Sequence, residues 1–413
     1  MKTARIRFFF QHIRAGWMAG CVFVLMVSSA CASSPAAQAA RAGSTSQGSA
    51  DDWFKKAVEL DGQGRVAEAL IWYQRAAEGK PGNGFYPARL GQHLLTKMLD
   101  WPNAVRAYQR AIGLGFTQSW MWSQYAHALR WLGETAFSRG DWKDARGIFD
   151  EAVRVSQTAG VRTNVIPYLQ HMSVLSRQAP FTATRTAEVR HRSLMILLED
   201  TGRSGEPRRR IKAKEAELAR MSFDFMRHWV RTATSGLVFI EGEVAVFREP
   251  VNALVPLEDG SLQLDAALAS RHLGSILDSR AGEVDSIILI WASDKHQTAH
   301  GGATRYSLDA GRRSVWRGHV QIPSLRMAHN GPYLLCHEFF HVVENMCGIR
   351  PRHGFEAANR GSFPGWTGSD EFSYYGWSFS DNIPRILASP EWRALGWKHF
   401  RFTHKYPVKN ERQ

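Results

Sequence analysis

A spacing of alanine and aromatic residues, found three times between residues 69 and 152, constrains the fold of this chain most strongly. The pattern is Ala-x3-aromatic-x2-Ala, and its copies begin at Ala69, Ala104 and Ala145. On a helix, small alanines let a neighbouring helix approach closely, while the aromatic side chain fills the gap beside them. The pattern therefore predicts pairs of packed helices. The full copies are Ala69-Tyr73-Ala76, Ala104-Tyr108-Ala111 and Ala145-Phe149-Ala152.

This element resembles the second helix of the tetratricopeptide repeat, whose period is about 34 residues. Leu132-Gly133 matches a dipeptide of the repeat's first helix, and Pro81 matches its closing proline. The resemblance implies an α-solenoid over residues 51–160, with an open concave surface for a protein partner or a substrate. The third copy requires an insertion around Thr117 to Ser123, and an irregular helical bundle is the alternative interpretation.

The N-terminus has the parts of a secretory signal. A positively charged segment precedes an apolar stretch from Ala15 to Ala30, which ends in small residues. This stretch is too short to favour a permanent membrane span. We therefore expect export to the periplasm or cell envelope. Residues 32–50, rich in Ala, Ser, Gly and Gln, are expected to form a flexible tether. The basic residues of the signal are Lys2, Arg5, Arg7 and Arg14.

The cleavage site of this signal has two interpretations. The run from Val27 to Cys31 resembles a bacterial lipoprotein cleavage box. This resemblance implies a signal over residues 1–31 and a lipid on Cys31 that attaches the protein to a membrane. Ser28 stands where such boxes carry leucine, so ordinary cleavage after Ala32 or Ala39 stays open.

Length, composition and charge limit the remaining possibilities. A chain of 413 residues exceeds what one hydrophobic core usually spans, which predicts two folded domains. With 44% hydrophobic and 22% charged residues, the composition argues against wholesale disorder. The net charge of +14 would suit a nucleic-acid partner, but the basic residues are scattered outside residues 208–214. Because no nucleic-acid-binding motif accompanies them, no such partner is expected.

Beyond the repeats the periodicity changes. Residues 161–215 are rich in Thr, Arg and Ser and are expected to form a connector, and a second domain is expected over residues 216–413. The pattern predicts, in chain order, a charged amphipathic helix, one or two strands, a helix and two further strands. These elements cover residues 208–232, 236–247, 264–277, 285–291 and 314–322.

A further helix is predicted from Asn330 to Gly348. Asn330 is a good N-cap, Pro332 suits the first turn, and glycine commonly ends a helix. Cys336 and Cys347 would stand about 16 Å apart along this helix, too far for a disulfide, so both are expected to be buried thiols. Apolar side chains nearly all round predict that the helix is buried. These are Leu334, Leu335, Phe339, Phe340, Val342, Val343 and Met346.

Within this helix stands His-Glu-x-x-His. His337 and His341 lie one above the other, so both imidazoles can bind one metal ion. Glu338 is angled away from the ion but can reach a metal-bound water as general base. Burying these groups without partners is costly, which favours metal binding over a core helix with hydrogen-bonded histidines.

The motif and the order of elements resemble the zincin metallopeptidases over residues 216–413. The resemblance implies a zincin-like α+β domain, a Zn²⁺ ion and hydrolysis of peptide bonds in a peptide or protein substrate. It also implies an edge strand that aligns the substrate shortly before the motif helix, and residues 314–322 are in the right place. Amidase action on cell-wall peptides would use the same chemistry.

The third zinc ligand stays open. Metzincins continue the motif as His-x-x-Gly-x-x-His, whereas Glu344 and Cys347 occupy those two positions here, so this subclass is not expected. Gluzincins supply a glutamate from a later helix, and aspzincins an aspartate within Gly-Thr-x-x-Asp-x-x-Tyr-Gly. The segment from Gly365 to Gly376 shares features with both. The resemblance favours Glu371, followed by Asp370 and then by His353 or Asp381.

The sequence offers alternatives for the oxyanion donor and for the function of the zinc domain. Tyr374 or Tyr375 is a candidate donor to the developing oxyanion, as tyrosines are in similar sites, or else both pack beside Trp366 and Trp377. The competing function is an envelope scaffold whose zinc domain is inactive or structural. Glu338 favours the enzyme, because a structural zinc site has no need for a base.

Overall fold

The computed structural model describes residues 48–347, apart from residues 159–165, 188, 204, 206, 237, 259, 281–282, 294–298 and 309–312. Contacts divide the chain into two compact units, residues 1–49 and 50–413, and the helices and strands below belong to the second. No helix among the described residues is both long and apolar enough to span a membrane. The predicted signal and all predicted site residues beyond Cys347 lie outside the described residues: His353, Asp370, Glu371, Tyr374, Tyr375 and Asp381.

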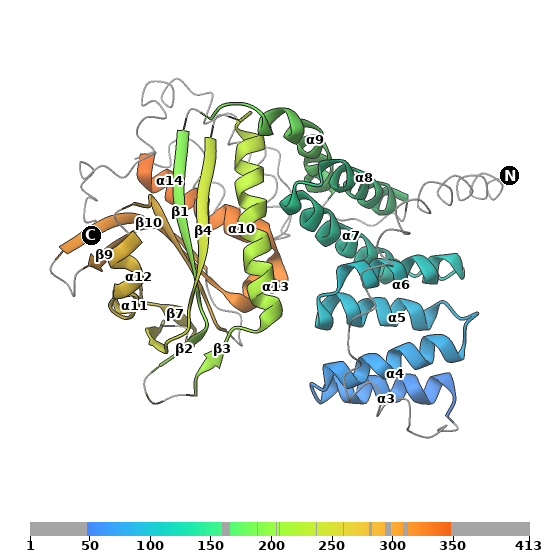
Figure 1. Cartoon of the computed structure of the whole chain (residues 1–413). Coiled ribbons are helices and arrows are strands. Elements are labelled where there is room, and N and C mark those ends of the chain that lie inside the picture. The colour runs from blue at the N-terminus through green and yellow to red at the C-terminus, as the bar shows by residue number, and fades with distance from the viewer. Residues whose placement is uncertain are drawn as a thin grey trace, which may run out of the picture. The chain divides into compact units, whose positions relative to one another are not determined.

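The first part of the second unit is helical, and successive helices stack side by side (Figure 1). The helices are α3 (Ala50–Gly62), α4 (Val66–Gly79), α5 (Phe85–His93), the π-helical turn η1 (Leu94–Met98), α6 (Trp101–Gly113), α7 (Ser119–Arg139), α8 (Trp142–Thr158) and α9 (Ile166–Ala183). The insertion predicted around Thr117 to Ser123 falls at the start of α7, which is long at 21 residues.

The predicted copies of the alanine and aromatic pattern lie on α4, α6 and α8, and their nine residues are at most 4% exposed. In two copies the aromatic ring packs against a glycine of the preceding helix. A Cβ on Gly91 would lie 2.9 Å from Tyr108, and a Cβ on Gly133 would lie 2.7 Å from Phe149. The prediction of closely packed helix pairs is confirmed.

The second part is built on a five-stranded sheet in the order β4-β1-β8-β10-β9. Strands β1, β4, β8 and β10 run parallel, whereas β9 lies at the edge and is antiparallel to β10. The bounds are β1 Val189–Leu198, β4 Val238–Phe247, β8 Ser286–Trp291, β9 His300–Leu308 and β10 Arg313–Pro323. Small ladders join β2 (Asp200–Gly202), β3 (Arg209–Arg210) and β5 (Val251–Asn252), and separately β6 (Leu254–Pro256) and β7 (Leu262–Leu264).

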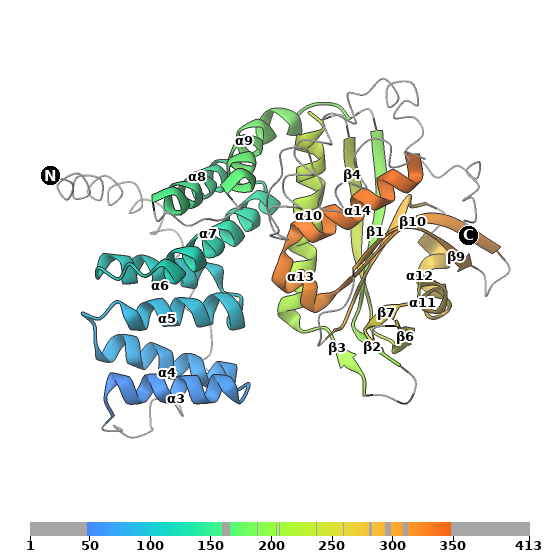
Figure 2. The same cartoon turned by 180° about the vertical axis from the view of Figure 1, so that it is seen from behind.

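Helices cover both faces of this sheet. The helices α10 (Ala213–Ala233), α13 (Ser324–Asn330) and α14 (Pro332–Cys347) lie on one face, as Figure 2 shows, and α11 (Ala266–His272) and α12 (Gly274–Arg280) on the other. Alternate residues of β8 divide between the two cores. Ile288 and Ile290 join the core of α10 and α14, whereas Ile287, Leu289 and Trp291 join the core of α11 and α12. A central strand buried on both faces is typical of a parallel sheet.

The structure differs from the sequence-based prediction in several elements. Residues 161–215, expected to form a connector, contain α9 and β1, a strand whose first half carries the polar residues Arg190, His191, Arg192 and Ser193. The helix predicted over 264–277 is divided into α11 and α12, which meet at Leu273 and Gly274. The strand predicted over 314–322 exists as β10 but lies between β8 and β9, so the prediction that it forms the edge is wrong.

We predict that Gly133→Ala destabilises the protein. The new Cβ would press on the Phe149 ring, and overpacking of this kind typically costs about 1–3 kcal/mol. This cost opposes the gain of about 1 kcal/mol that alanine brings to a helix interior. The control is Gly147→Ala in α8, where the new Cβ would have nothing within 4 Å and only the gain should appear. Urea unfolding measures both variants, and equal changes would contradict the close packing.

Candidate metal centre

The motif lies on one unbroken helix, as predicted. Helix α14 contains His337, Glu338 and His341 within its span of Pro332–Cys347. Its start differs from the prediction: Asn330 is the last residue of α13, and Gly331, with φ of +80°, separates the two helices. Asn330 is therefore not the N-cap of α14. The predicted end at Gly348 lies outside the described residues.

Most of the described side chains on α14 belong to the largest hydrophobic core. Its members on this helix are Leu334, Leu335, Cys336, Phe339 and Val342. His337 and Glu338 are also buried, at 7% and 6% exposed. The prediction of a buried helix with buried polar residues is confirmed for these positions. The Cys336 thiol is free, and burial raises its pKa, as expected for an unreactive buried thiol.

Two glycines bring the sheet very close to α14. A Cβ on Gly301 of β9 would overlap the carbonyl group of Glu338 and lie 2.8 Å from its Cα atom. A Cβ on Gly318 of β10 would overlap the Val342 side chain and lie 2.9 Å from the Cβ of Ser286. The backbone of the edge strand therefore packs directly on the backbone of the motif helix at Glu338.

A polar layer, which the sequence analysis did not identify, lies in the sheet beneath α14. Nε2 of His191 is 2.9 Å from Oγ of Ser286, which is 2.7 Å from Oγ of Ser193. The imidazole of His191 also contacts the Phe339 ring edge-on, with ring centroids 5.2 Å apart. All three polar residues are at most 1% exposed, so they are not placed to contact a substrate. Alternating polar residues in β1 were the signal available in the sequence.

The two histidines of the motif have the helical spacing of zinc ligands. His341 stands one turn beyond His337, a rise of about 6 Å, the spacing at which two imidazoles can bind one ion. Nitrogen ligands suit Zn²⁺, and burial of His337 limits competition from bulk water. Across the described residues, no three His, Cys, Asp or Glu side chains form a group that could hold a metal. The predicted third ligands, Glu371 and Asp370, lie outside that range.

Another buried histidine of the sheet, His319, belongs to its opposite face. A hydrogen bond of 2.6 Å joins its Nδ1 to the hydroxyl of Tyr306, a residue of the core formed with α11 and α12. Burial, and secondly the charge of His300, lowers the pKa of His319 to about 3. The ring is therefore neutral near pH 7 and takes no part in the candidate metal centre.

We predict that Gly301→Ala destabilises the protein by about 1–3 kcal/mol, because its Cβ would overlap the backbone of Glu338 and the backbone cannot yield as a flexible side chain does. Gly274→Ala is the matched control, since a Cβ at the start of α12 has nothing within 4 Å. Urea unfolding at pH 7 checks the pair. A Gly301→Ala protein as stable as the control would rule out the close contact between β9 and α14.

Comparison with known protein families supports the prediction of helical repeats in the first part of the chain. Residues 93–159 match the family model of the tetratricopeptide repeat. This span contains α6, α7 and α8, on which the second and third copies of the pattern stand. No curated protein matches the chain. Residues 93–159 are therefore similar to tetratricopeptide repeats, which supports the prediction made from the second and third copies of the alanine and aromatic pattern.

Proposed function

We propose that this protein is an exported zinc-dependent peptidase in which His337 and His341 hold the metal and Glu338 is the general base. The observation that carries the proposal is the position of these residues. They stand on one buried helix, and the edge strand of the sheet packs directly on that helix at Glu338. The proposal includes a zincin-like domain that begins near residue 216 and takes β1 from the preceding segment.

The edge strand supports a peptide as substrate. The resemblance to zincins implies such a strand before the motif helix, and β9, β10, α13 and α14 follow one another in the chain. Strand β9 pairs with β10 on one side, and no other strand of the described sheet pairs with its second side. An extended peptide can add to that side through backbone hydrogen bonds. Gly301 places this edge beside Glu338.

In the proposed reaction, Glu338 of the chain transfers a proton. Bound zinc would polarise the scissile carbonyl and acidify a water molecule. The carboxylate of Glu338 accepts a proton as the water oxygen bonds to the carbonyl carbon, and then donates it to the departing amine as the C–N bond breaks. At 6% exposure, Glu338 works in a poorly solvated environment in which electrostatic effects are strong. Tyr374 or Tyr375 is proposed as the oxyanion donor.

The repeats support a second role, protein interaction. The match over residues 93–159 favours a protein partner or substrate on the helical region, because stacked helix pairs present an extended surface. An envelope scaffold with an inactive or structural zinc domain is therefore the alternative function. A lipid on Cys31 would attach either protein to a membrane.

We predict one zinc ion per chain. His337→Ala and His341→Ala should each lose most of it, because the apolar side chains around α14 cannot replace the lost ligand. Elemental analysis of the purified mature protein checks this, with His272→Ala in α11 as the control. Zinc content equal to that of the unchanged protein in both variants would contradict the assignment.

The same analysis distinguishes the candidates for the third ligand. Glu371→Gln should weaken zinc retention against a chelator much more than Glu344→Gln, because Glu344 stands nearly one turn beyond His341 and would point past the ion. Zinc loss with Glu344→Gln alone would show that the proposed ligand set is wrong.

We predict that Glu338→Gln retains zinc but lowers peptide hydrolysis at least about a hundredfold, equivalent to about 2.7 kcal/mol in the barrier. The amide keeps the size of the side chain but cannot accept the proton. Glu217→Gln, on the exposed side of α10, is the control and should hydrolyse normally. A Glu338→Gln protein with full zinc and full turnover would refute the mechanism.

A further inference from the structure

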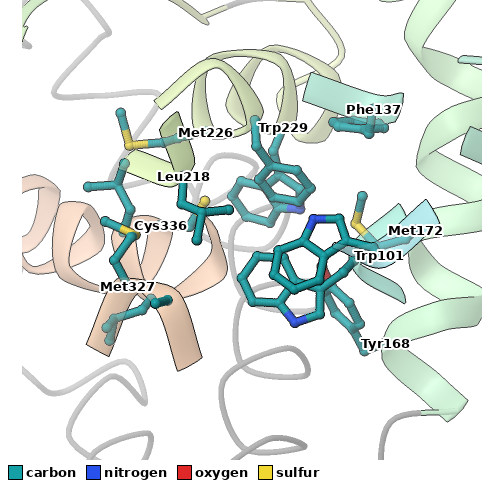
Figure 3. Packing of buried hydrophobic residues seen from close by; sticks show 14 of the residues in the cluster. Trp101, Phe137, Tyr168, Met172, Leu218, Met226, Trp229, Met327 and Cys336 are labelled. Atoms are coloured by element: carbon teal, nitrogen blue, oxygen red, sulfur yellow. The ribbon is translucent and has the colours of Figure 1, made fainter. Parts of the chain in front are cut away.

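The repeat helices and the motif helix share one hydrophobic core. The cluster runs without a break through α6, α7, α9, α10, α13 and α14. Figure 3 shows Trp101, Phe137 and Tyr168 from the repeat side facing Leu218, Met327 and Cys336 from the sheet side, with Trp229 between them. The end of the solenoid is thus part of the packing around α14.

A fully buried charge pair lies on the repeat side of this core. Arg130 and Glu134 stand four residues apart on α7, with no exposed side-chain area, and Nη1 of Arg130 is 3.3 Å from Oε1 of Glu134. The hydroxyl of Tyr168, on α9, donates a hydrogen bond of 2.7 Å to the same oxygen. Burial is the largest influence on Glu134 and leaves its pKa above the ordinary value, although Arg130 and Tyr168 act in the opposite direction and favour the carboxylate.

The second carboxylate oxygen of Glu134 faces the beginning of α14. It has no hydrogen-bond partner among the described residues and lies 3.3 Å from where a Cβ on Gly331 would be. The Trp131 ring is also 3.1 Å from that point, so a Cβ there would be tight, and the φ of +80° at Gly331 also favours glycine. After burial, Glu134 is the next cause that raises the pKa of the Cys336 thiol, one turn into the helix.

Few groups at the beginning of α14 can accept hydrogen bonds from the N–H groups of its first turn. Gly331 has no side chain with which to cap the helix, and Pro332 at the first helical position removes only one of the N–H groups that need a partner. The partial positive charge at a helix N-terminus is stabilised by a nearby anion, and the effect is larger in partly buried geometry. As a carboxylate paired with Arg130, Glu134 supplies such a charge, and it comes from the repeat region, about two hundred residues earlier in the chain.

We propose that Glu134 is a positioning residue, whose charge fixes the first turns of α14 and thereby the place of His337 and Glu338. The repeat helices then stabilise the position of α14, and they are not only a separate surface for binding. The consequence for metal binding and hydrolysis rests on the proposed function, whereas the effect on the helix does not.

Hydrogen exchange of the full chain tests the proposal. Glu134→Gln keeps the shape of the side chain and removes its charge. We expect the amides of α14 to exchange about fivefold to thirtyfold faster, while those of α3 and α4 exchange as before. The protein is measured after treatment with a chelator, so the result does not depend on whether His337 and His341 bind a metal.

The matched control is Asp61→Asn. Asp61 lies 3.1 Å from Nδ1 of the buried His93 within the first repeats, so its loss should speed exchange there and leave α14 unchanged. Glu134→Asp, which keeps the charge at a greater distance, should give a smaller rise in α14 and decides the question if the glutamine variant fails to fold. Unchanged exchange in α14, or an equal rise in every helix, would overturn the positioning role.

Discussion

The burial of α14 is the constraint on which the rest of the structure depends. A helix that is apolar nearly all round must be covered on every side, and one sheet face covers only one side of it. Here β9 and β10 pack against one side of α14, while α10, α13 and the end of the solenoid share a core with the described side chains of the helix. This requirement explains why the repeat region joins the sheet through a continuous core instead of a polar linker.

Helix α14 makes different kinds of contact with the sheet and with the repeat helices. On the sheet face, Gly301 and Gly318 let backbone approach backbone, so the distance between β9 and Glu338 is set by covalent geometry and not by adjustable side chains. On the repeat face, Trp131 and Glu134 enclose Gly331, where a large aromatic ring and a carboxylate meet the helix end. A helix held in this way varies little in position, which is what a metal or catalytic site requires of its support.

The features visible in the sequence were those with local periodicity. The alanine spacing identified the repeats, and the apolar surround of residues 334–342 identified α14 as buried, because each pattern repeats at helical intervals. Strand β1 was not recognised because its first half is polar; His191 and Ser193 of this half belong to the polar layer under α14. Strand β9 was not recognised because it contains glycines, and one of them, Gly301, makes the close contact with α14. The approach of Glu134 to Gly331 joins positions far apart in the chain, and no local pattern reports such a contact.

A shared core also couples the two parts of the chain thermodynamically. If a partner binds the repeats and favours one arrangement of α7, it changes the environment of Glu134 and hence the first turns of α14. By linkage, anything that orders α14 must then change the affinity of the repeats for that partner by the same factor. On the proposed function, a bound metal would order α14 through His337 and His341. On these proposals, the interaction role supported by the repeat match and the peptidase role would be coupled through the packing around Trp131 and Gly331.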